Sequence, residues 1–84
     1  MTQISKFILK VILGNSDNSI EFEKLCGLLD SIGFKCRIKG SHHIFYKEGI
    51  EEIINIQPNG KLAKSYQVKQ IRHLLLKYKL VNYE

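Results

Sequence analysis

The chain has 84 residues, of which 44% are hydrophobic, and carries a formal net charge of +5. This length fits one domain over residues 1–84, with a core too small to enclose a deep pocket on all sides. We therefore expect an open surface or a shallow groove as the functional site, which favours a large substrate such as a polymer.

The charge is distributed unevenly along the chain. Residues 1–34 have a formal charge of −1, whereas residues 35–84 have +6. A basic region attracts phosphate groups and accelerates encounter with nucleic acid. The charge alone is equally compatible with a role in solubility.

The cysteines, the histidines and the N-terminal segment restrict the other classes of function. Cys26 and Cys36 do not form a Cys-x-x-Cys pair, so we expect two reduced, partly buried thiols rather than a disulfide. The two Cys and three His also lack the spacing of a zinc site, and we expect no metal and no cofactor. The apolar start of the chain is interrupted by Lys6 and Lys10 and is too short to cross a bilayer. The sequence therefore predicts a cytoplasmic protein with no membrane partner.

Three segments have the apolar spacing of amphipathic helices, and they cover about residues 2–13, 21–32 and 66–79. Gly14 and Gly33 stand where the first two helices should end. Asn18 and Glu21 are spaced as a capping box for the second helix, and Ser65 is a candidate N-cap for the third.

Strands are predicted between the second and third helices. Residues 34–39 alternate, so that Phe34, Cys36 and Ile38 point to one side and three cations point to the other: Lys35, Arg37 and Lys39. Gly40 and Ser41 form a turn, and further strands follow at residues 42–46 and 51–57, joined by a hairpin turn at 47–49. A polar, basic loop then runs from residue 58 to 64.

The resulting order is α, α, β, β, β, α. Without its first helix it reads α-β-β-β-α, which predicts an α+β fold with a three-stranded antiparallel sheet and two helices on one face. This is a double-stranded-RNA-binding-like architecture, and such folds recognise RNA mainly by shape and by phosphate and 2′-OH contacts.

Candidate chemistry is concentrated at the turn before the second strand. The chain has no phosphate-binding Gly-rich loop, no zinc-protease motif and no spaced Asp cluster. His42 and His43 remain, and histidine can both accept and donate protons near neutral pH. A histidine beside Lys or Arg could deprotonate the 2′-OH of RNA and promote its attack on the adjacent phosphorus. The alternation does not decide whether His42 or His43 shares a face with the basic row.

Three segments resemble the HicA toxins of bacterial type II toxin–antitoxin systems: residues 28–34 (LLDSIGF), 39–45 (KGSHHIF) and 66–72 (YQVKQIR). The resemblance covers about residues 20–80 and implies a double-stranded-RNA-binding-like fold, an endoribonuclease that cleaves mRNA, and a HicB-type antitoxin as partner. The family's catalytic histidine directly follows Gly-Ser, which indicates His42.

On this interpretation the neighbours of His42 have supporting roles. Gly40 permits the tight turn, and Ser41 shapes it or binds a phosphate. The RNA backbone would contact five cations, the last two of them more weakly: Lys35, Arg37, Lys39, Lys61 and Lys64.

The sequence departs from the family at its N-terminus. Residues 1–19, with the predicted first helix, precede the usual start of the family. Two other functions remain open: a non-catalytic RNA-binding module, and a protein-interaction domain that docks through this first helix.

Overall fold

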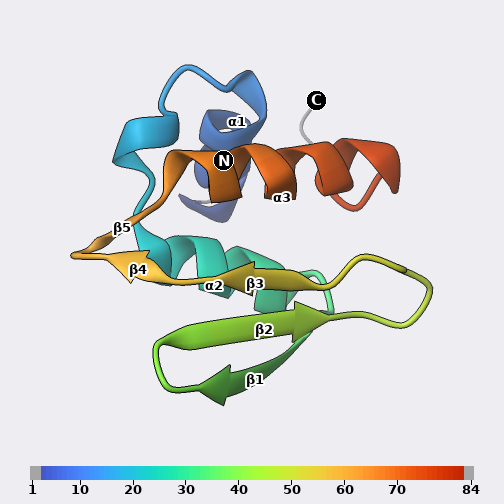
Figure 1. Cartoon of the computed structure of the whole chain (residues 1–84). Coiled ribbons are helices and arrows are strands. Elements are labelled where there is room, and N and C mark those ends of the chain that lie inside the picture. Colours follow the sequence, from blue (N-terminus) through green and yellow to red (C-terminus); the bar gives the residue numbers. More distant parts are fainter. Residues whose placement is uncertain (1–2, 83–84) are drawn as a thin grey trace.

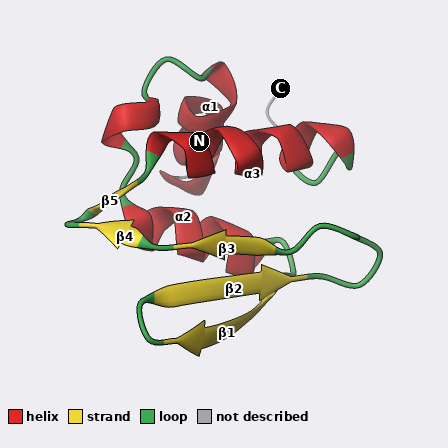
Figure 2. Ribbon diagram, in the orientation of Figure 1, coloured by secondary structure: helices red, strands yellow, loops and turns green. Residues whose placement is uncertain are grey.

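A computed structural model of the chain describes residues 3–82 (Figures 1 and 2). Residue 2, where the first predicted helix was expected to begin, lies outside the described residues. The elements in chain order are α1 (Gln3–Leu13), the 3₁₀ helix η1 (Asp17–Ser19), α2 (Phe22–Ser31), β1 (Lys35–Lys39), β2 (His42–Tyr46), β3 (Ile54–Ile56), β4 (Pro58–Asn59), β5 (Leu62–Ala63) and α3 (Ser65–Lys77). The α+β fold with a three-stranded antiparallel sheet is confirmed.

The sheet has the strand order β1-β2-β3, and both strand pairs are antiparallel. The third strand is shorter than the expected 51–57, and Glu52, which precedes it, contacts the end of α3. There Lys77 donates a hydrogen bond of 2.7 Å to its carboxylate, and the Tyr78 hydroxyl donates another. The expected loop at 58–64 instead contains a small antiparallel hairpin, β4–β5.

Helices α2 and α3 lie on one side of the sheet (Figure 1). Phe45, Ile54 and Ile56 of the sheet are buried with the apolar side chains of these helices. Helix α1 packs against α2 and α3 and lies away from the sheet. The side of the sheet opposite the helices is therefore uncovered within residues 3–82.

Strand β1 is the edge of the sheet, and all five of its residues are exposed. The prediction that Cys36 would be partly buried is wrong, since Cys36 is exposed, and Ile38 on the same side of the strand is 65% exposed. The alternation itself is correct, but the helices do not extend over this outermost strand. Cys26 on α2 is half-buried, and both cysteines are free thiols.

The helix starts also differ from the sequence prediction. The residues before α2 and α3 are Glu21 and Lys64, and neither makes a side-chain capping hydrogen bond. At α2, backbone hydrogen bonds with the β4–β5 hairpin replace a side-chain cap. Phe22 N–H donates to Lys61 C=O at 2.9 Å, and Ala63 N–H donates to Ile20 C=O at 2.8 Å.

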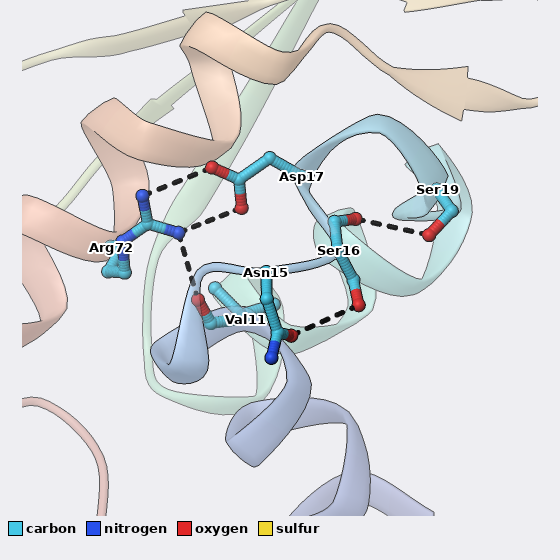
Figure 3. Close-up of polar contacts among 6 residues, drawn as sticks. All are labelled: Val11, Asn15, Ser16, Asp17, Ser19 and Arg72. Carbon is cyan, nitrogen blue, oxygen red and sulfur yellow. Dashed lines mark hydrogen bonds and ion pairs between the residues drawn. The ribbon is translucent and has the colours of Figure 1, made fainter.

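Arg72 of α3 binds the N-terminal segment (Figure 3). The Arg72 guanidinium donates to both carboxylate oxygens of Asp17, at 2.8 and 3.1 Å, and to the backbone oxygen of Val11, at 3.1 Å. The hydrogen bond that Arg72 donates to Asp17 raises the pKa of Arg72, so the guanidinium stays charged. Gly14 leaves room for it, because a Cβ there would lie 3.0 Å from Arg72 Nη1.

Candidate active site on the outer sheet face

The side of the sheet opposite the helices is called the outer face below. Strand register places on it the side chains of seven residues: Lys35, Arg37, Lys39, His42, Ile44, Tyr46 and Asn55. His42 therefore lies on the same face as the basic row, whereas His43 points to the helix side. This resolves the choice that the alternation of the sequence left open.

His42 occupies the first position of β2 and is exposed. Its direct partner across the strand pair is Lys39, and directly opposed residues have Cβ atoms about 4.5–5.5 Å apart. The two residues flank the turn formed by Gly40 and Ser41. Gly40 has a φ of +62°, in the left-handed region that residues with a Cβ rarely adopt. The turn thus places His42 and Lys39 side by side at one end of the outer face.

Two amide side chains contact His42 from the third strand and the residue after it. Asn55 Oδ1 lies 3.1 Å from His42 Nδ1. Gln57 Nε2 lies 2.9 Å from Nδ1 and 2.8 Å from Nε2. Sequence reasoning missed both residues, although Asn55 and Gln57 are polar residues two apart in an isoleucine-rich segment.

The remaining cations extend the site along β1. Arg37 lies over the Tyr46 ring, with its Cζ 5.9 Å from the ring centroid, a distance typical of cation–π contact. Lys35, Arg37 and Lys39 are all exposed and are spaced about 6.5–7 Å apart along the strand. A row of this kind can bind successive phosphates of a nucleic-acid strand.

His43 lies in a different environment. It is half-buried, meets the Phe22 ring edge-on at 4.9 Å between centroids, and lines a groove of about 730 Å³ between the start of α2 and the β4–β5 hairpin. Lys61 lines the same groove, and Lys64 is the half-buried residue before α3. The structure thus places Gly40, Ser41 and Lys39 next to His42. Arg37 and Lys35 lie further along β1 on the same face, and Lys61 and Lys64 lie outside the three-stranded sheet.

Among residues 3–82, no three side chains of the His, Cys, Asp or Glu type gather where they could hold a metal ion. In the same residues, no helix has the length and apolar character needed to cross a membrane.

A comparison with protein families identifies the chain. The family model of the HicA toxin of bacterial toxin–antitoxin systems matches residues 22–78. The match begins with α2 and ends just after α3, so it includes the whole three-stranded sheet and its outer face, whereas α1 and η1 precede it. No curated protein and no solved structure matches the chain. Since the family model covers more than half of the sequence, this chain belongs to the HicA toxin family.

Proposed function

We propose that this toxin is an endoribonuclease that cleaves mRNA, with His42 as the proton acceptor. The observation that supports the proposal most directly is the position of His42. It is exposed on the outer face, directly opposite Lys39 and at the end of a row of three cations. An open face of this kind admits an RNA strand, which a small closed pocket would exclude.

The proposed reaction uses the nucleophile that RNA itself carries. The unprotonated nitrogen of His42 accepts the proton of a 2′-OH group, and the 2′-oxygen forms a bond to the adjacent phosphorus. The bond between phosphorus and the 5′-oxygen breaks, which leaves a 2′,3′-cyclic phosphate on one product. The 5′-oxygen takes a proton from the His42 imidazolium or from water and leaves as a 5′-OH group. No activated water is required, so the step can proceed without a metal ion.

The cations supply the electrostatic part of the mechanism. Negative charge develops on the non-bridging oxygens as the phosphorus becomes five-coordinate, and a cation near these oxygens stabilises the transition state. Lys39 is the candidate because it is the direct cross-strand neighbour of His42. Arg37 and Lys35 lie further along β1, where they would hold the following phosphates and keep the strand extended.

The decisive experiment is a cleavage assay on a mixed-sequence mRNA in the presence of EDTA. His42→Ala should lose about 10²–10⁴-fold in rate, the usual contribution of a general base. His43→Ala, on the opposite side of the sheet, and His73→Ala, on the exposed surface of α3, are the matched controls and should keep cutting. Circular dichroism verifies that each variant is folded. Full activity in folded His42→Ala would refute the assignment, and RNA binding without cleavage by the wild type would favour a non-catalytic module.

The role of the basic row can be measured separately from cleavage. In the His42→Ala background, replacing Lys35, Arg37 or Lys39 by Gln should weaken RNA binding. Each replacement should also lower the slope of log K against log salt concentration by about 0.7, the value for one contact to a single-stranded phosphate. Lys24→Gln, a cation exposed on α2, serves as the control. Equal slopes in all four variants would show that RNA does not lie along β1.

Membership of a toxin–antitoxin family implies an antitoxin partner, and we propose a HicB-type protein that covers the outer face in the cytoplasm. Because RNA and antitoxin would then use the same cations, an excess of antitoxin should displace RNA from the toxin. Charge reversal at Arg37 should weaken both complexes. A ternary complex of toxin, antitoxin and RNA would place the antitoxin elsewhere.

A further inference from the structure

We propose that Asn55 and Gln57 are positioning residues for His42. Asn55 holds the ring in a single tautomer, Gln57 packs against the ring and restricts its rotation, and the buried Gln67 of α3 keeps Gln57 in place. The inference rests on the proposed role of His42 and adds three residues to it. The three residues belong to β3, to the position after it and to α3, and folding brings them together with His42 of β2.

Asn55 determines which ring nitrogen carries the proton. Its Oδ1 can only accept a hydrogen bond, so the His42 Nδ1 at 3.1 Å must be the donor. A neutral ring with hydrogen on Nδ1 has its lone pair on Nε2. For free histidine in water this is the less populated tautomer, so the neighbouring amide selects the form in which Nε2 is the base.

Gln57 restricts the orientation of the same ring. Its Nε2 is nearly equidistant from both ring nitrogens, at 2.9 and 2.8 Å, so the amide packs against the ring. The lone pair of an unprotonated ring nitrogen lies in the plane of the ring, so an amide on the ring face does not occupy it. Gln57 therefore restricts the rotation of the ring and leaves the His42 Nε2 lone pair accessible.

Gln67 connects this arrangement to the core. It is only 3% exposed and is the one buried polar side chain among the described residues. With its amide oriented so that both contacts are satisfied, Oε1 accepts from Gln57 N–H at 3.3 Å and Nε2 donates to Gln57 C=O at 3.2 Å. The side chain thus pairs with the Gln57 backbone as a neighbouring strand would, just beyond the end of β3.

The burial of Gln67 has a physical consequence for the site. Placing an amide in a core is unfavourable unless its hydrogen bonds are made, and here both are made to one residue. An apolar side chain of similar size would fill the same space but would not hold the Gln57 backbone. The amide of Gln57 would then no longer be kept against the His42 ring.

The test combines a spectroscopic readout, which needs no RNA, with the cleavage assay. In ¹⁵N-labelled protein, two-bond ¹H–¹⁵N correlation spectra distinguish the two tautomers of each neutral histidine. We expect His42 to have hydrogen on Nδ1 in the wild type and to change toward the other tautomer in Asn55→Ala. His73 provides an internal reference on the exposed surface of α3. Hydrogen on Nε2 in the wild type would overturn the proposal.

In the cleavage assay, Asn55→Ala, Gln57→Ala and Gln67→Met should each lose about tenfold to a hundredfold in rate, the effect of a misplaced catalytic group. Gln67→Met keeps the length of the side chain, and Gln70→Met on the exposed side of α3 is its matched control. The His42 resonances of Gln67→Met should shift, while those of Gln70→Met should not. Wild-type rates and unchanged His42 resonances in folded Gln67→Met would contradict the role of Gln67. A wild type that shows the expected tautomer but cuts no RNA would refute the proposed function while supporting the positioning of the ring.

Discussion

Replacing Arg72 by Met should reveal how strongly the N-terminal segment stabilises the domain. The Arg72 side chain is 19% exposed and that of Asp17 is 10% exposed, so the ion pair is largely withdrawn from water. The substitution removes three hydrogen bonds and leaves the Asp17 carboxylate without its cation. Breaking a fully buried pair costs about 3–5 kcal/mol. Because this pair keeps some exposure, we expect a loss of about 2–4 kcal/mol in the free energy of unfolding.

Urea denaturation followed by circular dichroism measures this loss, and a double-mutant cycle with Asp17→Asn isolates the pair. For a domain of this size, about 2–4 kcal/mol corresponds to a decrease in Tm of about 10–30 °C. Lys69→Met, which replaces an exposed cation on the same helix, should change stability by less than about 0.5 kcal/mol. A coupling energy below about 0.5 kcal/mol would show that the Arg72–Asp17 pair does not stabilise the attachment of the N-terminal segment. At temperatures where it is folded, Arg72→Met should cleave RNA like the wild type.

Three further predictions concern other parts of the molecule. Hydrogen bonds from Lys77 and Tyr78 lower the pKa of Glu52 from 4.5 to about 2, so the stabilisation it provides is present above pH 4.5 and is lost as the pH falls toward 2; in acid denaturation Glu52→Gln should show a smaller dependence on pH in this range. Gly40→Ala should destabilise the domain by about 1–2 kcal/mol in urea denaturation, because the φ of Gly40 is +62°. Gly27→Ala in the middle of α2 should instead stabilise it by about 0.5–1 kcal/mol, and a similar effect of both substitutions would show that Gly40 does not need its positive φ. In mass spectrometry at pH 8, an alkylating reagent should modify the exposed Cys36 before Cys26, since burial raises the pKa of the Cys26 thiol to about 11.

The helices and the first two strands could be predicted because their signals are local. Apolar spacing located α1, α2 and α3 to within a few residues, and the alternation of residues 34–39 correctly put Lys35, Arg37 and Lys39 on one face. The motif at Gly40-Ser41 also located the turn correctly. These features follow from the spacing of apolar residues and from turn-forming residues, and both can be read from a short segment of the sequence.

The remaining features depend on contacts between distant segments. The capping box expected from Asn18 does not form, because the backbone of the β4–β5 hairpin holds the start of α2 instead. Ile38 has the pattern of a buried residue, yet it lies on an edge strand that the helices do not reach. The face of His42 also required the register between β1 and β2, which fixes it opposite Lys39.

An exposed histidine on an open sheet has no pocket walls to orient it, so its orientation depends on contacts with neighbouring segments. For His42 these neighbours are Asn55 on β3 and Gln57 just beyond it, and Gln57 is in turn held by Gln67 of α3. On this argument the site depends on how α3 packs against the end of β3. Substitutions that displace α3 near Gln67 should therefore reduce cleavage without touching RNA, whereas loss of the Arg72 contact to the N-terminal segment should reduce stability alone. The two sets of variants separate a contact that orients the site from one that only holds the fold together.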